Sequence, residues 1–280
     1  MSAPALQESV RTVRAPTGPQ WIVRDSMVMV RRYLLHSYRQ PELIVFSTIQ
    51  PVMFVILFRY VFGGAIHTGA DYVDYLMPGI FVQTTVFNAL LTGLGLAYDL
   101  QAGIIERFKS LPMSRSAVLI GRNLTDMLRN VFVILLMLAV GYLVGFRIHG
   151  GVVATIGAIL LIVVFGFAFQ WISALIGVAV RNPEAVQSAG FIWVFPLTFL
   201  SSAFVPTGSI SPAWLQSIAV HNPFTVTVNA VRQLLMGDEA RHIAGLGTDP
   251  TANVLIALAW TVGLLVVFVP LAVRGYRRLS

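Results

Sequence analysis

The sequence contains no cysteine, which excludes disulfide bonds, thiolate metal sites and thiol catalysis. It also has few charged residues: Asp, Glu, Lys and Arg make up 11% of its 280 residues, whereas soluble domains contain about 25%. Hydrophobic residues account for 56%. This composition is typical of a membrane protein. The net charge of +7 then fits arginines at a membrane surface better than binding to nucleic acid, so no nucleic-acid partner is expected.

The sequence also lacks the motifs that carry catalysis or hold a nucleotide. It has no G-x-x-x-x-G-K-[ST] phosphate-binding loop, so if ATP drives this protein, another subunit hydrolyses it. No histidine lies mid-way along an apolar segment, and no two have the spacing of metal ligands. The histidines are His36, His67, His149, His221 and His242. Acids are absent from the centres of the apolar segments, so we expect no catalytic residue, metal or cofactor on this chain, and a membrane-embedded enzyme is disfavoured.

Six segments are long and apolar enough, or nearly so, to cross a bilayer, which takes about 20 residues. They are residues 43–62, 76–98, 119–146, 152–180, 185–205 and 252–273. The predicted fold is therefore an all-α polytopic membrane protein with six transmembrane helices in residues 41–280. The third segment begins with the charged residues Arg122, Asp126 and Arg129, three and four positions apart on one helix face. We expect these side chains to form ion pairs at the membrane interface, with a proton or substrate relay as the alternative.

The distribution of arginine and lysine predicts the orientation of these six segments. Fifteen of the nineteen Lys and Arg residues fall before the first segment, after the last, or in the second-to-third and fourth-to-fifth loops. Short cytoplasmic loops are enriched in such residues. Both termini are therefore predicted to lie in the cytoplasm.

The chain before the first segment divides into two parts. Residues 1–20 are polar and contain three prolines, which predicts a disordered cytoplasmic tail. In residues 21–40, Val23, Met27, Val30 and Leu34 share one helical face that the arginines avoid. This pattern favours an amphipathic helix in the membrane interface, and an ordinary soluble amphipathic helix is the alternative.

Residues 206–250 form a long external loop with two apolar stretches. Residues 210–220 and 224–236 are each too short to span a bilayer. We expect two re-entrant external helices before the last span, because a backbone that enters lipid must satisfy its own hydrogen bonds. A surface cap over the outer mouth is the alternative.

The most charged internal stretch is residues 99–122, between the second and third segments. Leu100, Ile104, Phe108 and Leu111 recur at helical spacing, which predicts a short amphipathic helix that ends before Pro112. Such a helix either rests on the membrane surface or docks on another protein. We favour docking.

Uncharged polar residues occur in three of the apolar segments. Ser47, Thr48 and Gln50 lie in the first, Gln83, Thr84, Thr85 and Asn88 in the second, and Gln187, Ser188, Ser201 and Ser202 in the fifth. Hydrogen bonds between helices would explain them, and so would a pathway for an amphipathic or lipid-like substrate. The candidate pathway residues are Gln83, Thr84, Phe87, Asn88, Trp193, Phe195 and Phe199.

Three stretches resemble a known family. They are YLMPGIF at 75–81, GIIERFKSLPMSR at 103–115 and NPFTVTVNAVRQLLMG at 222–237. Together they are similar to type-2 ABC transporter permeases, and most closely to the daunorubicin-exporter type of actinobacterial drug-resistance permease. The resemblance extends over nearly the whole chain.

The resemblance implies a membrane subunit of an ATP-driven exporter in the bacterial plasma membrane, acting by alternating access. Two permease chains, identical or different, would sit on two ABC ATPase subunits that bind ATP and Mg. The family's coupling helix falls on Gly103, Ile104, Glu106, Arg107, Phe108 and Pro112. A second ATPase contact falls on Arg181, Asn182 and Glu184.

Other transport functions remain open at this level. Permeases of the same family also export polysaccharides and glycolipids. A passive channel or an ion-coupled transporter belongs to a different class. An ion-coupled carrier should show a mid-span acid or a broken helix pair with internal symmetry, and the sequence shows neither.

Overall fold

The computed structural model describes residues 19–39, 41–64, 71–104, 116–243, 246 and 249–279, and these residues form helices and connecting turns without strands. The all-α prediction is confirmed. The long helices are α1 (Pro19–Tyr38), α2 (Pro41–Leu57), α3 (Tyr72–Gln101), α5 (Ala117–Val144), α6 (Gly151–Val180), α7 (Pro183–Phe199) and α10 (Pro250–Leu279). The shorter ones are the π-helix η1 (Phe58–Phe62), the 3-10 helices η2 (Thr207–Ser209) and η3 (Gly237–His242), and the α-helices α8 (Ala213–His221) and α9 (Pro223–Met236).

Four of the described helices are long and apolar enough to cross a membrane: α3, α5, α6 and α10. The other two predicted spans correspond to α2 with η1, which contain the apolar stretch Ser47–Phe62, and to the 17-residue helix α7. The N-terminus of α7 is fixed at Asn182–Pro183, and the helix ends at Phe199, with Leu200 as its C-cap. Four spans are thus supported by length and hydropathy, and the full set of six stays a prediction.

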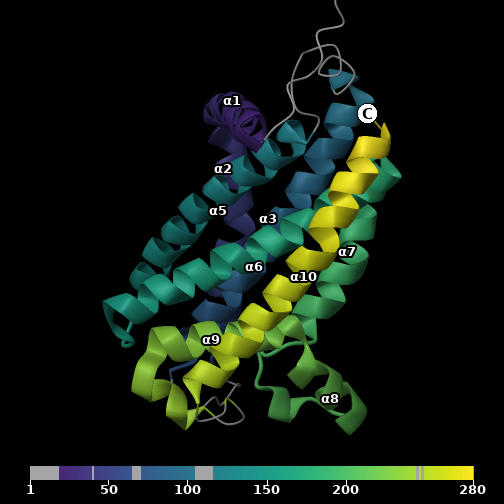
Figure 1. Cartoon of the computed structure of the whole chain (residues 1–280). Coiled ribbons are helices and arrows are strands. Elements are labelled where there is room, and N and C mark those ends of the chain that lie inside the picture. The colour runs from purple at the N-terminus through teal and green to yellow at the C-terminus, as the bar shows by residue number, and fades with distance from the viewer. Residues whose placement is uncertain are drawn as a thin grey trace, which may run out of the picture.

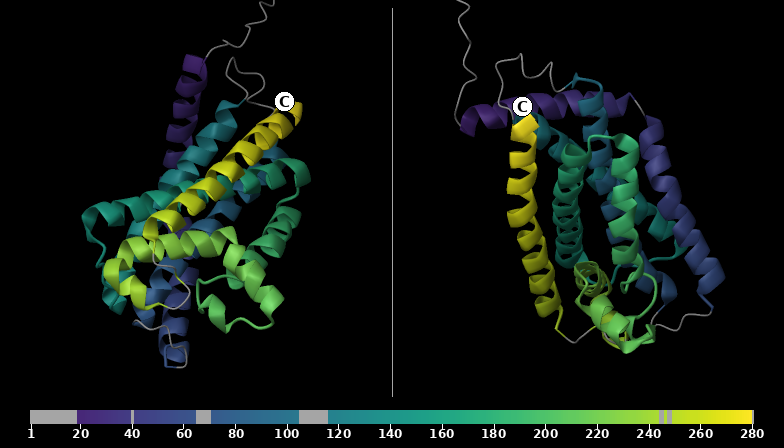
Figure 2. Two further views of the ribbon diagram at one scale, coloured as in Figure 1. Left: turned by 60° about the horizontal axis from the view of Figure 1, so that its bottom comes forward. Right: turned by 90° about the vertical axis from the view of Figure 1, so that its right-hand side faces the viewer.

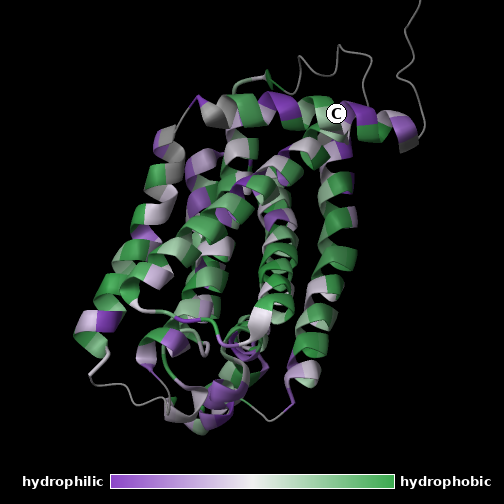
Figure 3. Cartoon of the chain, turned by 90° about the vertical axis from the view of Figure 1, so that its left-hand side faces the viewer, coloured by the Kyte–Doolittle hydropathy of each residue, from purple (hydrophilic) through white to green (hydrophobic). Residues whose placement is uncertain are grey.

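Helix α3 lies at the centre of the bundle. It packs against α2, α5, α6, α7 and α9. In its most apolar stretch 72% of the residues are buried, against 11% for α10, so α10 lies at the periphery. Figures 1 and 2 show the long helices running side by side, with α1 lying across the end that carries the C-terminus. Hydrophilic residues concentrate on α1 and at both ends of the bundle (Figure 3).

Glycines allow α3 and α6 to approach closely. A Cβ added to Gly93 would lie 2.2 Å from the carbonyl oxygen of Ser173, and one added to Gly177 would lie 2.4 Å from the carbonyl oxygen of Gly93. Small residues at such crossings bring two backbones into contact where lipid offers no hydrophobic driving force. This crossing therefore fixes the geometry of the helix that carries most of the candidate pathway residues.

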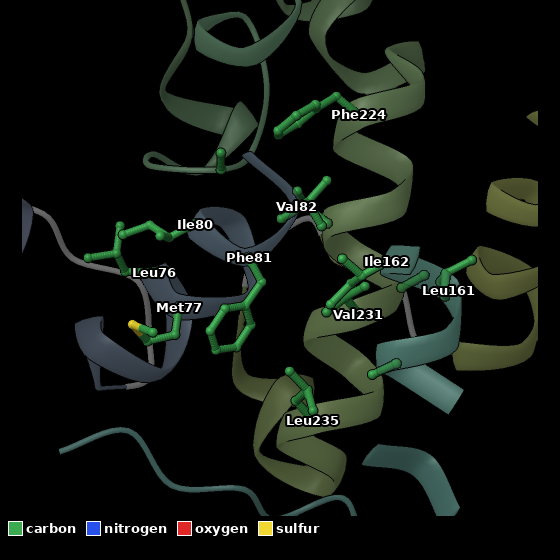
Figure 4. Close-up of a cluster of buried hydrophobic side chains, with 14 of the residues drawn as sticks. Leu76, Met77, Ile80, Phe81, Val82, Leu161, Ile162, Phe224, Val231 and Leu235 are labelled. Carbon is green, nitrogen blue, oxygen red and sulfur yellow. The ribbon is translucent and has the colours of Figure 1, made fainter. Parts of the chain in front are cut away.

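Helix α9 is part of the core, whereas α8 is mostly exposed. Phe224, Val228 and Val231 are completely buried at the helical spacing seen in the sequence. Figure 4 shows Phe224, Val231 and Leu235 of α9 in the cluster that also contains Phe81 of α3. The chain thus forms two helices in the predicted external segment. Whether they re-enter a membrane stays a prediction.

The N-terminus of α9 is set by its own sequence. The Asn222 side chain accepts a hydrogen bond from Phe224 N, and Pro223 occupies the first helical position. The helix ends at Gly237, whose φ is 58°. Asn222 also donates to the carbonyl oxygens of Leu197 and Leu200, both at 2.7 Å, so the same residue ties α9 to the end of α7.

Candidate functional site

A cavity of about 280 Å³ lies between α2, α3 and α7. Its polar lining comes from all three helices: Ser47, Gln50, Gln83, Thr84, Asn88 and Gln187. Phe54, Phe87 and Phe191 add aromatic surface. None of the lining residues ionises. An uncharged polar cavity with aromatic walls suits a neutral part of an amphipathic molecule.

Two amides of α3 that line this cavity have unpaired donors. Gln83 Nε2 and Asn88 Nδ2 are buried and have no hydrogen-bond partner among the described residues. Thr84 differs, because its hydroxyl donates to the Ile80 carbonyl oxygen at 2.7 Å within the same helix. A buried unpaired donor costs about 1–3 kcal/mol. Hydrogen bonds between the described helices therefore do not account for the presence of these two amides. Each amide nitrogen is available to donate to a molecule that enters the cavity.

The structure divides the predicted pathway residues into two groups. Gln83, Thr84, Phe87 and Asn88 line the cavity together. The three residues of α7 do not line it. Phe195 packs edge-on against Phe87 at 5.5 Å between centroids, and Phe199 stacks on Phe195 at 5.6 Å, so these two continue an aromatic row from the cavity. Trp193 stacks instead on Phe169 of α6 at 5.5 Å.

Sequence reasoning missed Phe191, which contributes to the cavity wall. Its ring centroid lies 6.3 Å from that of Phe87 and 5.4 Å from that of Phe195. The signal was present in the sequence: Phe191 lies one helical turn after Gln187 and one before Phe195. Polar and aromatic residues at that spacing share one face of α7.

A second and larger cavity, of about 700 Å³, lies between α1, α3 and α5 at the C-terminal end of the bundle. Arg122 forms an ion pair with Asp99 at 2.5 Å and approaches Asp126 at 3.8 Å. Arg129 pairs with Asp126 at 3.3 Å. The structure therefore brings Arg122, Asp126 and Arg129 together and adds Asp99 of α3, which the sequence pattern on α5 alone did not indicate.

Helices α1 and α3 shape this charged cluster around Arg122. A Cβ added to Gly95 would lie 1.7 Å from Arg122 Nη2, so a side chain at this position would require the guanidinium to shift. The Tyr33 hydroxyl donates to Asp99 Oδ2 at 3.2 Å, and the Arg122 guanidinium lies 5.3 Å from the Tyr33 ring centroid. Burial and, secondly, the Asp99 charge raise the pKa of Tyr33, which therefore remains a neutral donor.

This cluster joins α3 to α5 by an ion pair, and Tyr33 attaches α1 by a hydrogen bond and a cation–π contact. The polar residues that follow it along α3 are Thr92 and Asn88, which do not ionise. The geometry accordingly favours an ion-paired joint between α3 and α5, to which α1 is hydrogen-bonded, over a proton relay.

An arginine on α9 is buried at the opposite end of the bundle. Arg232 is 0% exposed, and its guanidinium donates to the carbonyl oxygens of Tyr75 and Ser202 at 3.0 and 2.9 Å and to Asn229 Oδ1 at 3.0 Å. It also lies 3.7 Å from the Tyr75 ring centroid. Backbone carbonyls and an aromatic face thus hold this charge, and they join α9 to α3 and to the segment after α7.

The predicted ATPase contacts are only partly described. Glu106, Arg107, Phe108 and Pro112 lie outside the described residues. Helix α3 continues through Leu100 to Gln101, and Gly103 follows with a φ of 66°, so Leu100 belongs to α3 and not to a separate amphipathic helix. Ile104 lines the cavity that contains Arg122.

The second predicted contact is the turn between α6 and α7. Arg181 ends α6 with a φ of 60°, and Asn182 Oδ1 accepts hydrogen bonds from Glu184 N and Ala185 N at 3.0 and 3.2 Å. Figure 2 shows this turn and the end of α3 at the same end of the bundle, the one that carries the C-terminus. The described residues of both predicted contacts therefore face the same side.

The fold and these sites define the class of protein: a helical membrane protein with an uncharged polar cavity among apolar helices. The chain belongs to the ABC-2 type transporter family, whose sequence model matches residues 25–236. The recognised resemblance is confirmed, and the chain is a transport component of the permease kind.

Individual relatives agree with this assignment. The daunorubicin resistance ABC transporter permease protein DrrB1 of Streptomyces coeruleorubidus is 35% identical over 238 residues, 85% of this chain and 80% of that protein. The probable doxorubicin resistance ABC transporter permease protein DrrC of Mycobacterium tuberculosis (strain ATCC 25618 / H37Rv) is 25% identical over 261 residues, 92% of this chain and 90% of that protein. The putative transport permease ycf38 of Cyanophora paradoxa is 24% identical over 223 residues, 76% of this chain and 75% of that protein.

Proposed function

We propose that this chain is the membrane subunit of an ATP-driven exporter that moves an amphipathic drug-like or lipid-like molecule out of the cytoplasm or the inner leaflet. The cavity between α2, α3 and α7 carries this proposal, because its lining combines unpaired amide donors with aromatic rings and has no charge. The similarity to a daunorubicin resistance permease supports an amphipathic aromatic substrate.

The proposed topology has six spans: α2 with η1, α3, α5, α6, α7 and α10. Residues 41–62 would extend about 33 Å as a helix and the 17 residues of α7 about 26 Å, against a hydrocarbon core of about 30 Å. Helix α1 lies across the C-terminal end, as an interfacial helix should. Both termini would face the cytoplasm, with α8 and α9 on the outside of a bacterial plasma membrane.

ATP hydrolysis would occur on a partner subunit, since this chain has no phosphate-binding loop. The ATPase would dock on residues 103–112 and on the turn at 181–184. Two permease chains, identical or different, would place their cavities along a shared path. Closure of the ATPase subunits on ATP and Mg would move residues 103–112 and with them α3, which contributes the largest share of the cavity lining.

Two groups of variants test the docking and the cavity separately. The permease is co-expressed with a candidate ABC ATPase, and pull-down, drug-stimulated ATP hydrolysis and dye export are measured. Gln83→Leu and Asn88→Leu should lower export and drug stimulation about tenfold while pull-down stays normal. Each variant removes a hydrogen bond between an uncharged amide and the transported molecule, worth about 1.4 kcal/mol. Thr155→Val is the control, because its hydroxyl bonds within α6.

The docking variants should show the converse result. Phe108→Ala removes an aromatic anchor worth about 2 kcal/mol and should weaken pull-down about thirtyfold, whereas Lys109→Ala should change it little. Glu106→Arg should also impair pull-down. Normal pull-down and export with both Phe108→Ala and Glu106→Arg would show that this segment merely rests on the membrane. Normal export with both cavity variants would refute the proposed pathway.

A further inference from the structure

Three potential metal ligands meet at the end of the bundle opposite the C-terminus. Asp74 lies in the first turn of α3, His149 in the turn between α5 and α6, and Glu239 in η3. One ligand atom from each lies within 4.8 Å of the other two. His149 Nδ1 is 3.2 Å from Glu239 Oε2. Sequence spacing could not group these residues, because they come from three distant segments.

Backbone packing brings two of the three segments together. His149 N and Gly150 N both donate to the Leu235 carbonyl oxygen at 2.9 Å. A Cβ added to Gly150 would lie 1.8 Å from the Leu234 carbonyl oxygen, so the α5–α6 turn lies directly against the end of α9. Figure 1 shows this turn beside α9. His149 and Glu239 are therefore brought together by the fold and not only by the contact between their side chains.

Asp74 provides an independent indication of a cation. It is only 7% exposed, and its Oδ1 accepts one hydrogen bond, from Arg147 N at 3.0 Å. The Arg147 guanidinium points elsewhere and donates to the carbonyl oxygens of Tyr142 and Phe146. Within the described ranges no arginine or lysine pairs with Asp74. A buried carboxylate without a counter-ion is unfavourable, and a metal ion held with His149 and Glu239 would neutralise it.

We infer that Asp74, His149 and Glu239 form a binding site for a divalent transition-metal ion of the zinc class. One imidazole and two carboxylates suit zinc, with a water as the fourth ligand, and the imidazole disfavours magnesium and calcium. Ligand atoms around tetrahedral zinc lie about 3.3 Å apart. The His149–Glu239 pair already has this separation. The Asp74 carboxylate lies within 4.8 Å of both, so the ion would require it to approach by at most about 1.5 Å.

The ion would lock one end of the bundle. It would connect the start of α3 and the α5–α6 turn to η3, which directly follows α9. Arg232 already ties α9 to Tyr75, the neighbour of Asp74. Movement of α9 relative to α3 would then require the ion to lose a ligand.

The test uses the full-length chain in lipid nanodiscs with an affinity tag that contains no histidine. Co²⁺ is titrated by absorption spectroscopy and then displaced with Zn²⁺. The wild type should bind one Co²⁺ with the visible bands of a low-symmetry site, and Zn²⁺ should remove these bands. His149→Gln and Glu239→Gln should each weaken binding at least about tenfold. His242→Gln is the matched control, because His242 is an exposed histidine in η3, the 3-10 helix that also contains Glu239.

Thermal unfolding supplies a second measurement. EDTA should lower the unfolding temperature of the wild type and of His242→Gln but not that of His149→Gln. Equal Co²⁺ affinity in the wild type and in both ligand variants would overturn the inference, and so would an equal loss in His242→Gln. Asp74→Asn can fail to fold because Asp74 is buried. Glu239, whose side chain is 49% exposed, therefore decides the test.

Discussion

Two arginines, Arg232 fully buried and Arg122 partly buried, show how single residues hold this apolar bundle together. Arg122 is neutralised by Asp99 and Asp126, whereas the described partners of Arg232 are carbonyl and amide oxygens and the Tyr75 ring. The planar guanidinium makes the second arrangement possible, because its donors point in several fixed directions. The approach of Arg122 to Asp126 was predicted from their spacing on α5. The role of Arg232 does not follow from the sequence, where it is one of the four Lys and Arg residues outside the predicted cytoplasmic segments.

Replacement of Arg232 should destabilise the protein strongly. Arg232→Met leaves the Tyr75 and Ser202 carbonyl oxygens and Asn229 without this donor, which should cost about 3 kcal/mol or more in the free energy of unfolding. Arg232→Lys should recover little, since an ammonium cannot reach all three acceptors and stack on Tyr75. Unfolding in mixed micelles measures the effect. Arg241→Met is the control and should cost less than about 1 kcal/mol, because its ion pair with Asp238 is exposed. A full rescue by lysine would contradict this account.

A methyl group at Gly95 should disrupt the charged cluster. The Cβ of Gly95→Ala would lie 1.7 Å from Arg122 Nη2, so the guanidinium must shift. We expect the shift to weaken the ion pair with Asp99 and to lower the free energy of unfolding by about 1.5 kcal/mol. Gly157→Ala on α6 is the control. Nothing lies within 4 Å of its added Cβ, and it should gain about 0.5–1 kcal/mol from reduced backbone entropy. If the two variants unfold alike, the close contact at Gly95 is unimportant.

At the scale of helices, local sequence signals predicted where helices occur and where they begin better than they predicted which helices contact one another. The apolar stretch at residues 224–236 predicted a helix there, and α9 does begin at Pro223, after its N-cap Asn222. The same signals misplaced the end of α3, because Leu100 fits both a separate amphipathic helix and the last turn of α3. The turn at Gly103 depends on its φ of 66°, and a sequence permits such a value without requiring it.

Residues that line one site were predictable from the sequence only where they lie on the same helix face. Gln83, Thr84 and Asn88 lie on one helix and could be grouped, and they do line one cavity. Trp193 was grouped with them for its aromatic character, but the rotation of α7 places it against Phe169 of α6. Asp99 and Tyr33 were missed because their contacts with Arg122 join three helices. Rotation about a helix axis is a tertiary property, and an apolar helix carries little sequence information about it.

The crossing of α3 and α6 should tolerate no side chain. Gly93→Ala and Gly177→Ala each place a methyl group against the other backbone, which should separate the helices and cost about 1–3 kcal/mol each. Because both methyl groups force the same separation, the double variant should cost clearly less than the sum. Gly263→Ala on α10, where nothing lies within 4 Å, is the matched control. Additive losses would show that the two glycines do not act at one crossing.

At the scale of the whole molecule, the six-span proposal predicts which positions are accessible from outside. The chain has no cysteine, so single cysteines report on their positions without background. Ser2→Cys and Ser280→Cys should be protected from an impermeant maleimide in intact cells and should react after lysis. Gly245→Cys should react in intact cells. External labelling at position 280 would refute the topology, because an even number of spans requires both termini on one side.

The last prediction concerns how two chains would share the pathway. In the proposed dimer each chain would supply one wall, formed by α2, α3 and α7, so a path between two permeases would require these walls to face each other. A cysteine at position 88 lies in the cavity, and one at position 195 lies on the aromatic row beside it. Asn88→Cys and Phe195→Cys should therefore cross-link between chains, with yields that change when ATP is trapped on the partner subunit.

The control for this experiment lies on the peripheral helix. Val266 on α10 is 67% exposed and lies in an apolar stretch of which only 11% is buried, so Val266→Cys should face lipid and remain monomeric under the same oxidant. Cross-links are read as dimers on non-reducing gels. If position 266 cross-links while positions 88 and 195 never do, with or without nucleotide, then α10 and not the polar cavity forms the contact between chains. In that case each cavity would serve its own chain.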